Sequence, residues 1–299
     1  MTRPLEVFSL LIPLGLLLPV SIHAKDPRKD PDEIGNRNVG KGVNFYSLER
    51  EIALGKEMAR DIEWQSKFIN EPIITEYINR LVQNLVLNSD AKVPFTIKVL
   101  DSDDVNALAL PGGYLFVNSG LILKAGNEAE LAGVLAHEIA HVAARHGTRE
   151  ATKVQIVNLA SIPLIFMGGG VGYLVREGLN LAVPLGFLRF SQASEREADF
   201  LGLQYLYKAG YDPISFVDFF ERLQSLEKTK PGSLSRLFSS HPMTSTRIRT
   251  AQREIQQILS PRSQYVVDTS EFESVKARLT AMQAWKMDTQ VYSLKLRNR

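Results

Sequence analysis

The segment His137-Glu138-Ile139-Ala140-His141 constrains this chain more than any other, because it ties a helix to a metal site. A helix turns once in about 3.6 residues, so histidines four positions apart lie on one face and reach a single Zn²⁺. Glu138 is then placed to take a proton from a water on that metal. Two of the five histidines in the sequence stand in this segment, which argues against a coincidental surface pair.

The flanking residues predict that the motif lies within a helix. Asn127 and Glu130 form a capping box, with Asn127 as the N-cap. Gly147 is expected to end the helix. The buried face is predicted from apolar residues at helical spacing: Leu131, Val134, Leu135, Ile139 and Val142.

A catalytic zinc site needs a third protein ligand. His146 stands one residue early for the longer pattern that adds a third histidine. We therefore interpret His146 as a histidine at the C-terminal end of the helix, where it complements the helix dipole.

Downstream, Glu195 and Asp199 share a face if Ser194–Phe200 is helical. We predict that Glu195 is the third ligand and that Asp199 accepts a hydrogen bond from the non-ligating nitrogen of a zinc-bound histidine. The alternative is an ordinary charged helix start.

These motifs resemble the M48 family of zinc metallopeptidases, in which H-E-x-x-H is followed by E-x-x-x-D. The resemblance runs from about Leu48 to Ala251 and includes two further segments, Asn106–Gly113 before a strand and Ser240-His241-Pro242 followed by Arg247. It implies an α+β fold: a mostly helical zincin-type domain with a small β-sheet whose edge strand borders the active-site cleft.

The resemblance also implies one Zn²⁺ per chain, held by His137, His141 and Glu195, and it places His241 and Arg247 at the cleft. His241 either donates to the developing oxyanion or occupies the open zinc position and holds the enzyme inactive. Arg247 would orient the substrate carbonyl or His241.

The expected substrates are polypeptides. Tyr114–Val117 is predicted to be a strand at the sheet edge near the active site, where an extended peptide adds by backbone hydrogen bonds. The alternative is that Pro111-Gly112-Gly113 merely shapes a hairpin.

Charge and cysteine content exclude other classes of function. The net charge of 35 − 33 = +2 gives no reason to expect a nucleic-acid partner. The sequence has no cysteine, which excludes thiol catalysis, disulfides and a lipoprotein anchor.

The chain is expected to divide into four parts. Residues 1–24 resemble a signal peptide, cleaved after Ala24, although an uncleaved anchor is the alternative. Residues 25–47 are expected to be a flexible leader, 48–260 the metallopeptidase domain and 261–299 a C-terminal extension. This organisation predicts a periplasmic protein.

The stretch 154–190 is the most ambiguous, because Val157–Val175 is apolar and long enough to span a bilayer, yet Gly168-Gly169-Gly170 interrupts it. Our first interpretation is a soluble hairpin that caps the cleft. The second is peripheral membrane association through 157–175, and the third is a transmembrane hairpin.

The predicted function is zinc-dependent endopeptidase activity on misfolded or unassembled envelope proteins, with Glu138 as general base. The alternative is a chaperone-like holdase that uses the same cleft with little turnover. Glu138 favours the peptidase, because a structural zinc site gains nothing from a general base.

Overall fold

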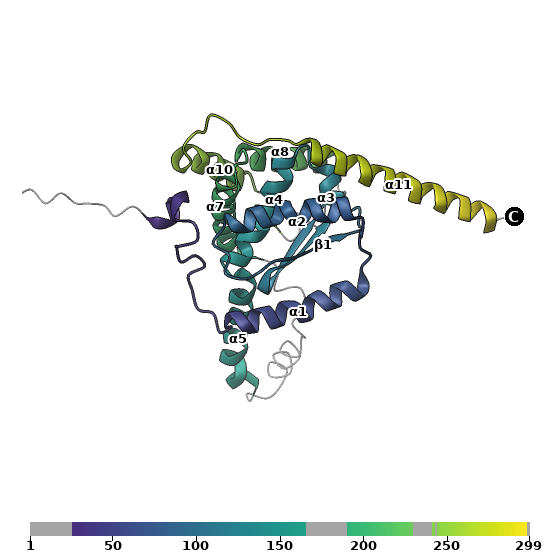
Figure 1. Ribbon diagram of the computed structural model, residues 1–299. Coiled ribbons are helices and arrows are strands. Elements are labelled where there is room, and N and C mark those ends of the chain that lie inside the picture. The colour runs from purple at the N-terminus through teal and green to yellow at the C-terminus, as the bar shows by residue number, and fades with distance from the viewer. Residues whose placement is uncertain (1–25, 166–189, 230–240, 243, 298–299) are drawn as a thin grey trace, which may run out of the picture.

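The computed structural model describes residues 26–165, 190–229, 241–242 and 244–297 (Figure 1). It confirms the α+β prediction, because long helices surround one small sheet. The helices are α1 (Leu48–Gln65), α2 (Pro72–Leu87), α3 (Ser119–Lys124), α4 (Glu128–Ala143), α5 (His146–Ile165), α7 (Gln192–Lys208), α8 (Ile214–Thr229), α10 (Ser245–Ile258) and α11 (Ser270–Arg297). Three short 3-10 turns are η1 (Pro27–Lys29), η2 (Pro31–Glu33) and η3 (Pro111–Gly113).

The sheet contains β1 (Thr96–Leu100), β2 (Ala107–Leu110) and β3 (Tyr114–Asn118) in the order β1-β3-β2. β3 pairs in parallel with β1 and antiparallel with β2. The prediction that Tyr114–Val117 forms the sheet edge is therefore wrong, because this strand is the central one. The edge near the metal motif belongs to β2, which contacts α4.

The sheet separates two apolar layers (Figure 1). Side chains alternate across a strand, and in β3 Phe116 packs with Ala59 of α1, while Leu115 and Val117 enter the main core on the side of α2 and α4. Both layers form because β3 is apolar on both faces.

Helix α4 is the centre of the fold, and every one of its residues is buried. The predicted cap is confirmed, since the Asn127 side chain accepts a hydrogen bond from the Glu130 amide at 2.9 Å. The Glu130 carboxylate accepts from the Gly126 amide at 2.7 Å, one residue before the cap. The bond to Asn127 satisfies an amide in the first turn of the helix that has no partner within the helix.

The predicted end of this helix at Gly147 is wrong. α4 ends at Ala143, and α5 begins at His146. Between them, Arg145 adopts a positive φ of 56°, a conformation that reverses the chain after a helix and is uncommon for a residue other than glycine. Arg145 is held there by hydrogen bonds from its guanidinium to Glu51 and to the Tyr46 carbonyl. His146 is consequently the first residue of α5 and not a C-terminal histidine of α4.

Residues 26–47, for which we expected a flexible leader, lie against the domain. The Arg37 and Asp90 side chains form an ion pair at 2.9 Å, and at most 1% of either is exposed. Arg37 also donates to Gln204 at 2.6 Å, and Tyr205 donates to Asp90 at 2.9 Å. Arg37 thus attaches the leader to the turn after α2 through a buried ion pair and to α7 through a hydrogen bond.

The C-terminal helix α11 begins on the domain and extends away from it (Figure 1). Phe272, Val275 and Leu279 are buried at its start, where it packs on α2 and α3. The rest of α11, which follows these buried residues, extends away from the domain.

Two sequence predictions fall outside the described residues: the signal peptide at 1–24 and the stretch 166–189 of the apolar hairpin. Among the described residues, no helix combines the length and apolar content required to cross a membrane.

Replacing Arg37 with Met should lower the free energy of unfolding by about 3–5 kcal/mol, because Asp90 would remain as a buried charge without its cation. The measurement is urea unfolding of the full chain. Arg28→Met is the matched control, since its ion pair with Asp26 is exposed, and we expect no measurable loss there. Equal stability of the Arg37 variant and wild type would show that the leader is not part of the folded unit.

Candidate metal centre

Helix α4 brings His137 and His141 together as the spacing predicts. Their Nε2 atoms lie 3.1 Å apart, and each residue is only 2% exposed. Because neighbouring turns of a helix stack side chains four residues apart, this approach follows from the motif itself.

Helix α7 supplies the acidic residues. Gly202 lies against the backbone of His137, and a Cβ atom at Gly202 would come within 3.1 Å of it. α7 therefore packs close to α4, and the Glu195 carboxylate lies 3.5 Å from His137 Nε2 and 3.4 Å from His141 Nε2.

The spacing of these atoms fits zinc. A tetrahedral zinc ion with ligands at about 2.0–2.1 Å requires ligand atoms about 3.4 Å from one another. The two histidine Nε2 atoms are 3.1 Å apart, Glu195 Oε1 is 3.4 Å from His141 Nε2, and the other oxygen, Oε2, is 3.5 Å from His137 Nε2. Two imidazoles and a carboxylate are also donors that zinc prefers. These residues, together with His241, form a buried group that could hold a metal ion.

Asp199 lies where the sequence predicts it. One carboxylate oxygen is 3.1 Å from His137 Nδ1, the nitrogen that faces away from the cluster. A carboxylate at this position favours the His137 tautomer that carries its proton on Nδ1, which leaves Nε2 free to bind a metal.

Arg247 neutralises the acidic side of the centre. Its Nε and Nη2 atoms both donate to Asp199 at 2.7 Å, and its Nη1 atom lies 2.8 Å from Glu195. Nη1 also donates to the Pro242 carbonyl at 3.0 Å. Arg247 therefore orients the two carboxylates and the turn that carries His241.

His241 lies inside the ligand cluster. Its Nδ1 atom is 2.9 Å from Glu195 and 3.4 Å from His137 Nε2. Its Nε2 atom is 3.3 Å from the Glu138 carboxylate. It thus lies between the candidate ligands Glu195 and His137 on one side and the Glu138 carboxylate on the other.

Glu138 connects the cluster to the sheet edge. One of its oxygens accepts a hydrogen bond from the Ala109 amide of β2 at 3.2 Å. The Asn118 amide donates to the Asn106 carbonyl, and antiparallel partners alternate between bonded and non-bonded pairs. Ala107 and Ala109 therefore direct their backbone groups away from β3, toward the open edge.

The charges of the cluster are strongly coupled. Burial lowers the pKa of His137, but its contacts with Asp199 and Glu195 outweigh burial and raise that pKa to about 9. Burial raises the pKa of Glu195, whereas its hydrogen bonds with the histidines bring it far below the usual range. In the protein without metal, His137 thus holds a proton among carboxylates, and a divalent cation would replace that proton.

The sequence analysis missed one contact of the centre. His146 is fully buried, and its Nδ1 atom lies 3.0 Å from Nδ1 of His141. Its Nε2 atom lies 3.1 Å from the Glu197 carboxylate. Glu197 stands between Glu195 and Asp199 in the sequence, so its position next to two predicted site residues was the available signal.

The chain is similar to known peptidases. The sequence profile of peptidase family M48 matches residues 70–255. Beta-barrel assembly-enhancing protease of Escherichia coli (strain K12) is 31% identical over 246 residues, which cover 79% of this chain and 49% of the relative. The chain spans about half the length of these assembly-enhancing relatives.

Two other relatives are similar over shorter segments. Metalloprotease LoiP of Escherichia coli (strain K12) is 34% identical over 62% of this chain and 73% of the relative. Mitochondrial metalloendopeptidase OMA1 of Schizosaccharomyces pombe is 32% identical over 58% of this chain and 51% of the relative.

Glu254 on α10 gives a test of the electrostatics near Asp199. Burial and the charge of Asp199 raise the pKa of Glu254 from 4.5 to about 7, and its Oε2 atom has no hydrogen-bond partner in the structure. As pH rises from about 4.5 to about 7, the Glu254 carboxyl group ionises in the unfolded chain before it ionises in the folded protein. Wild type therefore loses stability over this range, whereas Glu254→Gln does not. The variant should melt higher than wild type at about pH 8 and equally at about pH 4. The same difference in melting temperature at both pH values would refute the raised pKa of Glu254.

Proposed function

The chain belongs to peptidase family M48, and on that premise we propose that it is a zinc-dependent endopeptidase with His137, His141 and Glu195 as ligands. The single observation that carries the proposal is the convergence of these three buried side chains, with donor atoms 3.1–3.5 Å apart, beside Glu138. When bound, zinc would polarise the scissile carbonyl and lower the pKa of a water to about 7.

We assign the proton transfers to Glu138. Its carboxylate would take a proton from the attacking water and return it to the leaving amine. The Ala109 amide holds one carboxylate oxygen, so the other, which faces His241, is the one that moves the proton.

We propose that the substrate is an extended polypeptide bound along β2. The N–H and C=O groups of Ala107 and the C=O group of Ala109 face the open edge, where an added strand would pair with them, while the Ala109 N–H donates to Glu138. Because Ala109 contacts Glu138, a peptide on this edge would lie next to the general base. Backbone pairing does not depend on side chains, which suits a protease with many substrates.

The name of one relative supports a more specific proposal for where the protein acts and on which substrates. The relative that this chain matches over 79% of its length is named for enhancing β-barrel assembly. We therefore propose that this protein acts in the periplasm on misfolded or unassembled envelope proteins.

His241 has the position of a removable inhibitor. Its Nδ1 atom lies among the ligand atoms, and its Nε2 atom faces Glu138. A catalytic zinc site needs an open position for water. We propose that His241 occupies this position in a closed state and leaves it when substrate binds.

Glu138→Gln should bind one zinc per chain yet lose casein cleavage by about 10²–10⁴-fold, because the amide cannot accept the water's proton. Zinc content and fluorescent-casein cleavage are the measurements, with exposed Glu57→Gln as the control that retains full activity. Wild-type turnover in the Glu138 variant would exclude the proposed mechanism. A zinc-loaded wild type without cleavage of any denatured protein would favour the holdase.

His241→Ala should raise casein turnover on the order of tenfold, which corresponds to a closed state favoured by about 1.4 kcal/mol. The double variant with Glu138→Gln is the control, and it should be inactive if the added activity comes from the same site. A fall in activity with unchanged zinc content would instead identify His241 as the donor to the oxyanion.

A further inference from the structure

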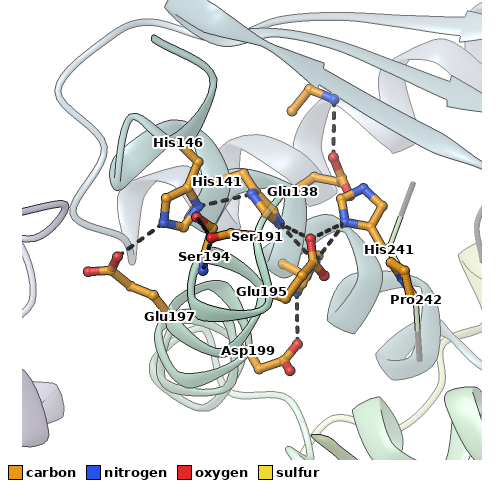
Figure 2. A network of polar contacts seen from close by, with 12 residues as sticks. Glu138, His141, His146, Ser191, Ser194, Glu195, Glu197, Asp199, His241 and Pro242 are labelled. Carbon is orange, nitrogen blue, oxygen red and sulfur yellow. Dashed lines mark hydrogen bonds and ion pairs between the residues drawn. The ribbon is translucent and has the colours of Figure 1, made fainter. Parts of the chain in front are cut away.

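The two histidines on α4 have different partners on the side away from the cluster. His137 contacts the Asp199 carboxylate directly through Nδ1. His141 contacts another imidazole, that of His146, and His146 in turn contacts the Glu197 carboxylate. Figure 2 shows His146 between His141 and Glu197.

The break between α4 and α5 creates this contact. On a continuous helix, residues five apart lie about 140° from each other around the axis, so His146 would point away from His141. The positive φ of Arg145 reverses the chain instead, and His146 returns to within 3.0 Å of His141.

The direction of the hydrogen bonds follows from the role of His141. If its Nε2 atom binds zinc, its Nδ1 atom carries the proton and must donate. His146 Nδ1 is then the acceptor, and the proton of a neutral His146 lies on Nε2, where it donates to Glu197. Each donor in this series faces an acceptor, and the series ends on a carboxylate.

Burial keeps water away from the hydrogen bonds that join His141, His146 and Glu197. His146 is 0% exposed, so water does not compete for the His141 proton. Arg149 also contacts Glu197, at 3.1 Å, and keeps that carboxylate in place. All these side chains lie on α4, α5 and α7, so the ring of His141 is oriented by helices on two sides.

We infer that His146 and Glu197 are positioning residues for the metal, which orient His141 as Asp199 orients His137. The inference rests on the proposed zinc site. It assigns a function to the two residues that the ligand pattern leaves out.

The test compares zinc affinities of the full chain by competition with a chelator. His146→Leu leaves the His141 proton buried without an acceptor, and zinc affinity should fall roughly 10–100-fold. His146→Asn places an amide oxygen near the former Nδ1 position, so it should restore part of the loss. Glu197→Gln should weaken binding less than His146→Leu, because its oxygen still accepts. Lys153→Gln is the matched control, since it removes an exposed ion pair with Glu150 on the same helix and leaves His146 and Glu197 unchanged, and its zinc affinity should equal that of wild type.

A spectroscopic measurement separates positioning from general stability. In the zinc-loaded protein, the imidazole N–H signals of His137 and His141 report their two partners separately. His146→Leu should move the His141 signal and leave that of His137, which remains on Asp199. A variant that only loosened the fold would disturb both signals and would lower the melting temperature of the metal-free protein.

The outcomes distinguish the inference from the proposed function. Wild type that binds no zinc would overturn both. The inference alone would be overturned if wild type binds zinc, if His146→Leu and Glu197→Gln both bind it with wild-type affinity, and if the His141 signal does not move.

Discussion

The close packing of α7 on α4 is the constraint on which the metal centre depends. It places Glu195 and Asp199 beside buried histidines, and Gly202 makes the approach sterically possible. The centre holds the buried carboxylates of Glu138, Glu195 and Asp199, and the Arg247 guanidinium contacts Glu195 and Asp199, so with neutral imidazoles these groups carry −3 + 1 = −2. Uncompensated buried charge is costly, so the packing is favourable only if a proton or a cation balances it. A divalent metal matches this deficit.

Local patterns allowed part of this centre to be predicted from the sequence. The helical spacing of His137 and His141, the Asn127 cap and the pairing of Glu195 with Asp199 all depend on residues at most four positions apart. The strand order could not be predicted in this way, because β3 lies between β1 and β2 through contacts that span the sheet. The break at Arg145 was also hidden, since the nearby Gly147 was the better candidate by residue type alone.

The N-terminal segment shows why composition can mislead. Residues 25–47 are polar and rich in glycine and proline, which favours a flexible chain. The buried Arg37 side chain nevertheless attaches the segment to Asp90, in the turn after α2, and to Gln204 of α7. The partners of Arg37 lie 53 and 167 residues away in the sequence, so the composition of the segment alone does not reveal these contacts.

The ligands differ in how firmly the fold holds them, and this difference suits a protease that opens and closes. His137, His141 and Glu195 lie on α4 and α7, both buried against each other. His241 instead precedes α10, and the turn that carries it is held by the bond from Arg247 to the Pro242 carbonyl. Movement of His241 would break contacts with Glu195 and Glu138 but leave the helices in place. Because Arg247 also binds Asp199 and Glu195, one guanidinium connects the turn that carries His241 to two carboxylates of the centre. In the proposed mechanism, His241 would therefore leave the centre without displacing the proposed ligands on α4 and α7.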